Sequence, residues 1–303
     1  MAAVADPEQQ LAWEARQRPR AAIAAIVGAL LTLAGFIWSA AAFKDLPRSY
    51  LLTSLARAPE PGSIGSQPSL RTPEFQFYDS HAFTFIGSSV VRAIAYVGFA
   101  IAVTFLAQAT RARRPELPRL VVYVPMVGAL LTAAGSVLGG VGTVVAVQHF
   151  LDGTRTVDAA ADVASDSLLL TANLISTLAP LAIAAGLLLV SLNAMRVGLL
   201  TRFLGILGMI VAALAVILQF VFAFAVAFWL LSLGLLFLNR VPGGAPPAWR
   251  TGQAEPWPSQ RELAAARRGA ASAKSPPEPA PEPAAAPTGR AHPASKKRKR
   301  KRR

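Results

Sequence analysis

Few side chains in this sequence have the types and spacing that chemistry requires. The chain has no cysteine, which excludes disulfides, thiolate metal sites and cysteine nucleophiles. His81, His149 and His292 are widely separated along the chain, whereas a metal site needs three or four converging ligands. The motifs of zinc proteases, serine hydrolases and phosphate-binding loops are absent from the sequence. We therefore expect a protein that is not an enzyme and that holds no metal or cofactor.

Three polar side chains lie in or beside long apolar stretches. Arg92 directly precedes the uncharged residues 93–110, and a charge inside a membrane indicates function by default. Residues 93–110 alone are about long enough to span a bilayer, so we favour an Arg92 that extends to the outer interface. Asn173 and Thr177 share one helical face. They predict either a polar path or, more commonly, hydrogen bonds to a neighbouring helix.

The C-terminus carries the most distinctive charged feature, a run of eight basic residues. The run consists of Lys296, Lys297, Arg298, Lys299, Arg300, Lys301, Arg302 and Arg303. Attached to a membrane protein, it predicts binding to anionic lipid or to RNA. A simpler explanation is equally open, because basic residues beside a membrane span keep that side in the cytoplasm.

Long uncharged apolar stretches must position these groups. They cover residues 21–43, 93–110, 120–148, 167–195 and 203–239. Each has about 18 residues or more, which is enough to cross a hydrocarbon core of roughly 30 Å as a helix. A soluble fold cannot bury five such stretches. The predicted fold class is therefore all-α, a polytopic membrane helix bundle embedded in the lipid bilayer.

The stretch 203–239 fits either one long helix or two short spans. One helix of its 37 residues would extend about 55 Å, nearly twice the hydrocarbon core. Basic residues in short loops mark the cytoplasmic side, and a turn near Gln219 would place Arg240 on the same side as Arg20. We therefore predict about six transmembrane helices in a bacterial inner or plasma membrane, with both termini cytoplasmic.

The predicted domain organisation has three parts. A cytoplasmic segment, 1–20, precedes a transmembrane domain, 21–240, which has an outer loop at about 44–85. The tail, 241–303, is rich in Pro and Ala and holds fourteen Lys and Arg against four Glu. A segment of this composition cannot bury enough apolar surface to fold alone. It is predicted to be disordered.

Three segments carry a resemblance to a known family. They are DPEQQLAWEARQRPR at 6–20, LNAMRVGLLTRFLG at 192–205, and the tail segment from Pro247 to Ser259. Together they resemble an uncharacterised family of bacterial, actinobacterial multi-pass membrane proteins whose domain has no assigned function. The resemblance implies a helical membrane fold and supplies no catalytic residue, cofactor or substrate.

Two functions remain open. The first is a non-enzymatic scaffold or accessory protein that binds a protein partner or a second copy of itself. The alternative is a passive or facilitated carrier of a small neutral solute. A continuous polar cavity lined by Asn173 and Thr177 near mid-membrane would favour the carrier, and a packed, dry bundle would favour the scaffold.

Overall fold

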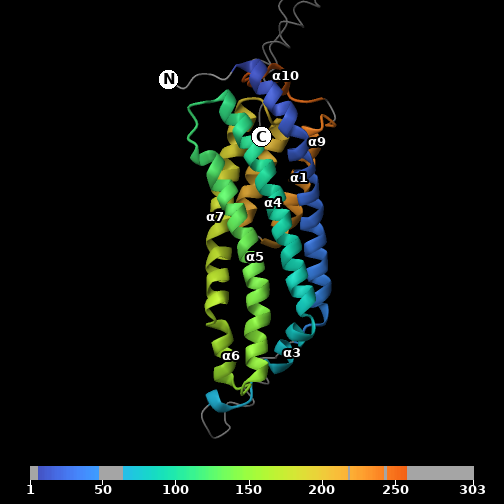
Figure 1. Ribbon diagram of the computed structural model, residues 1–303. Coiled ribbons are helices and arrows are strands. Elements are labelled where there is room, and N and C mark those ends of the chain that lie inside the picture. Colours follow the sequence, from blue (N-terminus) through green and yellow to red (C-terminus); the bar gives the residue numbers. More distant parts are fainter. Residues whose placement is uncertain (1–5, 48–63, 218, 242–243, 258–303) are drawn as a thin grey trace, which may run out of the picture. The chain divides into compact units, whose positions relative to one another are not determined.

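The protein is a bundle of antiparallel helices, shown in Figure 1 as a computed structural model that describes residues 6–47, 64–217, 219–241 and 244–257. Within these residues there is no β-strand, so the predicted all-α membrane helix bundle is confirmed. Four helices are long and apolar enough to cross a membrane. They are α1 (Pro7–Ala42), α4 (Ala82–Arg113), α5 (Leu120–Asp152) and α7 (Ser167–Arg196). Two shorter apolar helices, α8 (Arg202–Ile217) and α9 (Gln219–Phe237), follow.

The six apolar helices pack in a closed ring. Each helix packs against the next along the chain, and α9 returns to pack against α1. Glycine lets several of these pairs approach closely. A Cβ on Gly98 of α4 would lie only 2.6 Å from the carbonyl oxygen of Ala24 in α1. A Cβ on Gly135 of α5 would lie 2.7 Å from Ile175 of α7, whereas one on Gly139 would meet nothing nearer than 3.7 Å. Gly135 therefore serves close helix packing, as small residues commonly do in membranes, whereas Gly139 does not require it.

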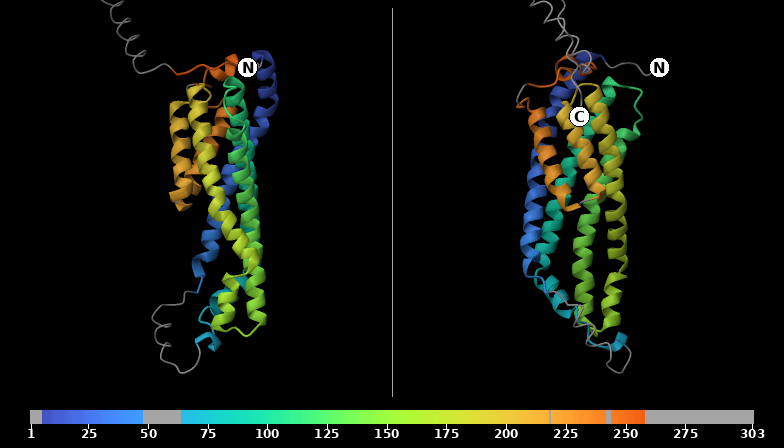
Figure 2. Two further views of the ribbon diagram at one scale, coloured as in Figure 1. Left: turned by 90° about the vertical axis from the view of Figure 1, so that its left-hand side faces the viewer. Right: turned by 180° about the vertical axis from the view of Figure 1, so that it is seen from behind.

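The ambiguous stretch 203–239 forms a helical hairpin. Helix α8 ends at Ile217 and α9 begins at Gln219, and the Trp229 indole in α9 donates to the Leu204 carbonyl in α8 at 3.1 Å. With 16 and 19 residues, the two helices extend about 24 and 29 Å. The long helices extend about 45 to 54 Å by the same rise. The hairpin therefore lies along only one half of the bundle, as Figure 2 shows.

Charge separates the two ends of the bundle. We call one end of the bundle the basic end. It holds the start of α1, the starts of α5 and α8, and the ends of α4, α7 and α9. It carries Arg16, Arg18, Arg20, Arg111, Arg113, Arg114, Arg119, Arg196, Arg202 and Arg240. The opposite, acidic end carries Asp79, Asp152, Asp158, Asp162 and Asp166. Between these ends, the described parts of the apolar helices carry no charged side chain except Arg92, which fits a membrane-embedded protein.

The predicted outer loop at 44–85 contains helical structure at the acidic end. Helix α3 (Thr72–Ser80) packs against α5, and α6 (Val157–Ala164) follows α5 along the chain. Phe75 of α3 is buried and meets the ring of Phe150 edge-on, with centroids 4.6 Å apart. Thr72 is the first residue of α3, and Arg71 takes the capping position. Residues 48–63 lie outside the described part of this loop.

The boundary of the C-terminal tail differs from the prediction. The tail was predicted to begin at residue 241, but residues 244–257 pack against the basic end, where Ala248 and Trp249 are buried. The short helix α10 (Ala248–Thr251) ends at Gly252, whose φ of +70° places it in the left-handed region. The tryptophan side chain supplies enough apolar area for this segment to pack on the bundle. The average composition of the whole tail, 241–303, does not reveal this difference between its first part and the rest. The predicted disorder of 258–303 falls on residues outside the described ones.

Cysteine labelling can test which side of the membrane each end occupies. Ala161 in α6 and Ala254 beyond α10 are both exposed, and the absence of native cysteine makes single substitutions unambiguous. In intact cells an impermeant maleimide should label Ala161→Cys and not Ala254→Cys, since the basic end is predicted to be cytoplasmic. After lysis both variants should react. Labelling of Ala254→Cys in intact cells would reverse the predicted topology.

Candidate functional site

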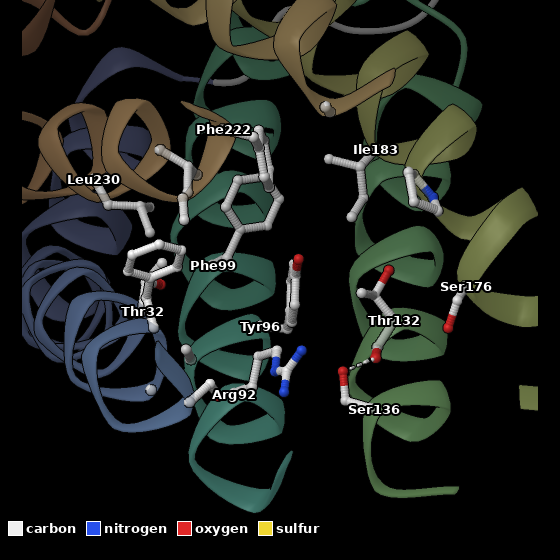
Figure 3. A pocket seen from close by; sticks show the side chains of 18 residues that line it. Thr32, Arg92, Tyr96, Phe99, Thr132, Ser136, Ser176, Ile183, Phe222 and Leu230 are labelled. Atoms are coloured by element: carbon white, nitrogen blue, oxygen red, sulfur yellow. Dashed lines mark hydrogen bonds between the residues drawn. The ribbon is translucent and has the colours of Figure 1, made fainter. Parts of the chain in front are cut away.

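A cavity of about 360 Å³ lies inside the bundle beside the tip of the α8–α9 hairpin (Figure 3). It exists because the hairpin is shorter than the four helices around it. Its volume lies in the usual range for ligand sites. Most of its wall comes from α1, α4, α7 and α9. The polar members of the lining are Thr32, Ser39, Arg92, Tyr96, Thr132, Ser136 and Ser176, and the bulky apolar members are Phe36, Phe99, Ile183, Phe222, Val226 and Leu230.

Arg92 lies at one end of this cavity. Helix α4 begins at Ala82, earlier than the predicted span, so Arg92 is inside the helix. Between the charged ends of the described apolar helices it is the only charged side chain, and it forms no hydrogen bond or ion pair with any other residue in this part of the chain. Nineteen positions separate it from Arg111, roughly 28 Å along the helix. That distance is close to the thickness of a hydrocarbon core.

The hydroxyl groups of the cavity are largely occupied by their own helices. Thr32 donates to the Gly28 carbonyl at 2.7 Å, and Thr132 to the Gly128 carbonyl at 2.8 Å. Ser136 donates to the carbonyl of Thr132 at 2.8 Å. Their oxygens remain available only as acceptors.

Tyr96 differs from these hydroxyl groups. Its phenol points into the cavity in Figure 3 and forms no hydrogen bond within the described chain. It lies four residues after Arg92, so the two side chains share one face of α4. Arg92 and Tyr96 therefore place two unsatisfied donors on α4, and the hydroxyl groups of Ser39 and Ser176 in the lining likewise form no hydrogen bond within the described residues.

Asn173 and Thr177 do not line the cavity. Both are exposed, and the Thr177 hydroxyl donates to the Asn173 carbonyl of the same helix at 2.8 Å. They border a shallow groove on the outer surface of α7, beside Val216 at the hairpin tip. Ser176 borders both the groove and the cavity, so the two spaces adjoin.

Sequence reasoning missed Tyr96, Thr132 and Ser136 as cavity residues. The spacing of Arg92 and Tyr96 was a usable signal, because residues four apart on a helix are neighbours. No comparable signal identifies Thr132 and Ser136. Their position opposite Arg92 depends on how α5 packs against α4.

The bundle is tightly packed between the cavity and the basic end. The barrier consists of Leu187, Val190, Leu199, Leu200, Leu204, Trp229, Leu233 and Leu236, each at most 4% exposed. These side chains belong to one apolar core that extends to Phe237 and Trp249. The cavity therefore has no polar continuation toward the basic end.

A buried ion pair ties the helices together at the basic end. Arg113 of α4 and Glu14 of α1 form a two-bond contact, with Arg113 Nη2 3.1 Å from Glu14 Oε2 and Nη1 bonded to Oε1. Arg113 also donates to the Ala248 carbonyl at 2.6 Å and to the Ala109 carbonyl at 3.0 Å. The side chains of the pair are 0% and 3% exposed. One guanidinium thus connects α1, α4 and the segment beyond α9.

Two tryptophans attach this segment to the connection between α7 and α8. The Trp249 indole donates to the Leu199 carbonyl, and the Trp257 indole donates to the Leu200 carbonyl, each at 2.8 Å. The Arg18 guanidinium lies 4.5 Å from the centre of a Trp249 ring. The three segments that carried the family resemblance, 6–20, 192–205 and the described part of 247–259, therefore meet at one end. We call this assembly the basic platform.

No family model, curated protein or solved structure matches this chain. Within the described residues, no group of three or more His, Asp or Glu side chains is placed to hold a metal ion. The basic run from Lys296 to Arg303 lies outside the described residues. Functional inference therefore rests on the cavity and on the basic platform.

Proposed function

We propose that this protein is a non-enzymatic scaffold or accessory subunit of a bacterial cell membrane. The observation that carries the proposal is the basic platform, in which three segments distant in sequence form one buried network. The Arg113 guanidinium bonds two of these segments, at Glu14 and Ala248, in a defined geometry, and the Trp249 and Trp257 indoles bond the third. The topology that fits this role has both termini in the cytoplasm.

The exposed surface of the platform is suited to an acidic partner. Arg16, Arg20, Arg119, Arg196 and Arg250 are exposed around the buried pair. Charge of one sign on a surface steers and selects partners of the opposite sign. The rigid network beneath it lowers the entropy that binding must overcome. The partner in this proposal is a protein with an acidic face on the cytoplasmic side.

The polybasic run supplies a further attachment in this proposal. Residues 296–303 contact anionic lipid or RNA. Each Lys or Arg beside an anionic membrane contributes about 1 kcal/mol, so eight of them bind measurably even when the contributions are strongly non-additive. Lipid and RNA both lose affinity as salt rises. The run therefore strengthens attachment of the platform without supplying a catalytic group.

A passive or facilitated carrier of a small neutral solute is the second candidate. The cavity favours it, because its hydroxyl oxygens and Tyr96 offer hydrogen bonds inside an apolar bundle. The packed core on the basic side opposes it, since a solute would have to displace Leu204, Trp229 and Leu233, which are at most 4% exposed. The scaffold requires no such rearrangement.

Quantitative co-purification from native membranes tests the scaffold. Full-length protein should retain one partner at near-equal stoichiometry in mild detergent. Arg250→Glu and removal of residues 296–303 should together reduce the retained partner about tenfold or more, because the acidic partner then meets fewer positive charges and one repulsive carboxylate. Arg155→Glu makes the same charge change as Arg250→Glu but at the acidic end, where Arg155 is exposed, and should leave the partner bound.

Solute flux distinguishes the two functions. Purified protein should not accelerate glycerol entry into phosphatidylcholine vesicles above that of protein-free vesicles. Faster entry that is abolished by Ala223→Leu, which narrows the cavity, would establish the carrier. Absence of any stoichiometric partner together with such flux would overturn the scaffold.

A further inference from the structure

We propose that the cavity beside the hairpin tip binds one anionic membrane lipid, with its acidic headgroup on Arg92 and one acyl chain in the apolar interior. The proposal does not depend on the scaffold role. It rests on three features of the cavity: an unpaired guanidinium, a gradient from polar to apolar lining, and a lateral opening toward the bilayer.

Arg92 defines the charge of the ligand. It has no acidic partner in the described chain, although it lies in an otherwise uncharged stretch of helix. A guanidinium in such surroundings is stabilised by an anion that accepts two parallel hydrogen bonds. A phosphate or carboxylate meets that need, and the membrane supplies such groups at the level of its headgroups. Arg92 lies at about that level, roughly 28 Å from the basic end.

Tyr96 and the α5 hydroxyl groups complete the polar end. Figure 3 shows Arg92 directed toward Thr132 and Ser136, with the phenol of Tyr96 farther inside. Tyr96 is partly buried, and its hydroxyl forms no hydrogen bond with any described residue, so it can donate to a ligand in the cavity. An ester oxygen just below the headgroup would accept its hydrogen bond.

The remainder of the cavity is suited to a hydrocarbon chain. Phe99, Ile183, Phe222 and Leu230 line it, and each is at most 8% exposed. Aromatic and aliphatic side chains without a polar partner favour an apolar guest. A small neutral solute would leave this part of the cavity unfilled and Arg92 unpaired. A lipid satisfies both ends at once.

The path into the cavity comes from the lipid side. The groove beside Val216 adjoins the cavity through Ser176, Pro180 and Ala215, which border both spaces. At the hairpin tip Val216 is 50% exposed and Ile217 is 72% exposed. An acyl chain can therefore enter sideways between α7 and the hairpin tip without crossing the packed core.

Photo-crosslinking of the full-length protein in vesicles tests this site. The vesicles are phosphatidylcholine with a few per cent of phosphatidylglycerol that carries a diazirine in one acyl chain. After illumination, adducts should map to Phe99, Ile183 and Phe222. A phosphatidylcholine probe with the same chain should label these positions about tenfold less. Mapping the adducts separates cavity binding from attraction of the same lipid to the basic tail.

Matched variants separate the contribution of the lipid headgroup to binding from that of the acyl chain. Arg92→Gln should lower cavity adducts about tenfold or more, which corresponds to the loss of a hydrogen bond to a charged group. Arg119→Gln, an exposed arginine at the basic end, should leave them unchanged. Ala223→Leu retains Arg92 and narrows the interior, so it should also reduce the adducts. Excess glycerol phosphate should not displace the probe, because the headgroup alone lacks the chain.

Several outcomes would overturn the proposal. They are equal cavity labelling by the two probes, labelling unaffected by Arg92→Gln, and adducts confined to lipid-facing positions such as Ile94, which is 50% exposed. Displacement by glycerol phosphate would show a headgroup site without a chain. Thermal unfolding of Arg92→Gln should match the unaltered protein, because an arginine at the interface is inexpensive to hold. If that variant does not fold, Ala223→Leu decides the result alone.

Discussion

Replacing Arg113 with methionine should lower the free energy of unfolding by about 3 to 5 kcal/mol, the usual effect of removing one partner of a buried ion pair. The substitution leaves the Glu14 carboxylate at 3% exposure with only the Gln10 amide, at 2.7 Å, as a side-chain donor. It also removes the donor to the Ala248 carbonyl. The packing of residues 244–257 on the bundle should loosen with it.

Thermal unfolding in detergent measures this effect. For a domain of this size 1 kcal/mol corresponds to about 2 to 4 °C, so the midpoint should fall by roughly 6 to 20 °C. Arg119→Met is the control, since Arg119 is exposed at the same end, and it should shift the midpoint by less than about 2 °C. The double variant Glu14→Met with Arg113→Met should recover most of the loss, because apolar side chains often replace a buried pair without penalty. A single variant as stable as the control would show that the pair is not buried.

The second large effect is expected at Gly186, where α7 meets Pro125 of α5. A Cβ at Gly186 would lie 2.4 Å from the proline Cδ and 2.7 Å from its nitrogen. A proline ring on a helix backbone has little freedom to move, so Gly186→Ala must separate the two helices. Overpacking of this kind costs about 1 to 3 kcal/mol, occasionally more, and we expect a loss near the upper end of that range.

Gly139→Ala is the matched control for Gly186→Ala. It lies on α5 at the same interface, where the added Cβ would meet only Ala172, at an ordinary 3.7 Å. Since alanine is favoured over glycine in a helix by about 0.5 to 1 kcal/mol, Gly139→Ala should be neutral or stabilising. Denaturation midpoints of the two variants should therefore move in opposite directions. Equal midpoints would contradict the close packing of α5 and α7 at Pro125.

Much of the architecture could be predicted because its determinants are local. The length and composition of an uncharged apolar stretch such as 167–195 are enough to predict that it crosses a bilayer, since the hydrocarbon core requires about 20 such residues. The turn near Gln219 was also predicted, although no glycine or proline marks it. Basic residues on both sides of 203–239 indicated it, because a single helix would have placed Arg240 with the acidic residues.

The sites were less predictable, and Arg92 shows the reason. The sequence identified it as a charge beside an apolar stretch, but its exposure to a cavity depends on the short hairpin that leaves space next to it. Asn173 and Thr177 show the converse. Their spacing suggested one polar face, and that face lies toward the outside of the bundle rather than toward the cavity. Helical spacing predicts which residues share a face, but it does not predict whether that face contacts lipid, another helix or a cavity.

By itself, the sequence determined that this protein is a membrane helix bundle with one strongly basic end. Hydrophobic length and the sign of charge are properties of each segment, so no knowledge of packing was needed. Only the tertiary structure decided that Glu14 and Arg113 pair, that Trp249 and Trp257 hold 244–257 on the platform, and that a cavity forms beside the hairpin tip. These features join residues far apart in the sequence, such as Arg113 and Ala248, which are 135 positions apart. Such contacts are selected by the shape and hydrogen-bonding needs of the assembled bundle.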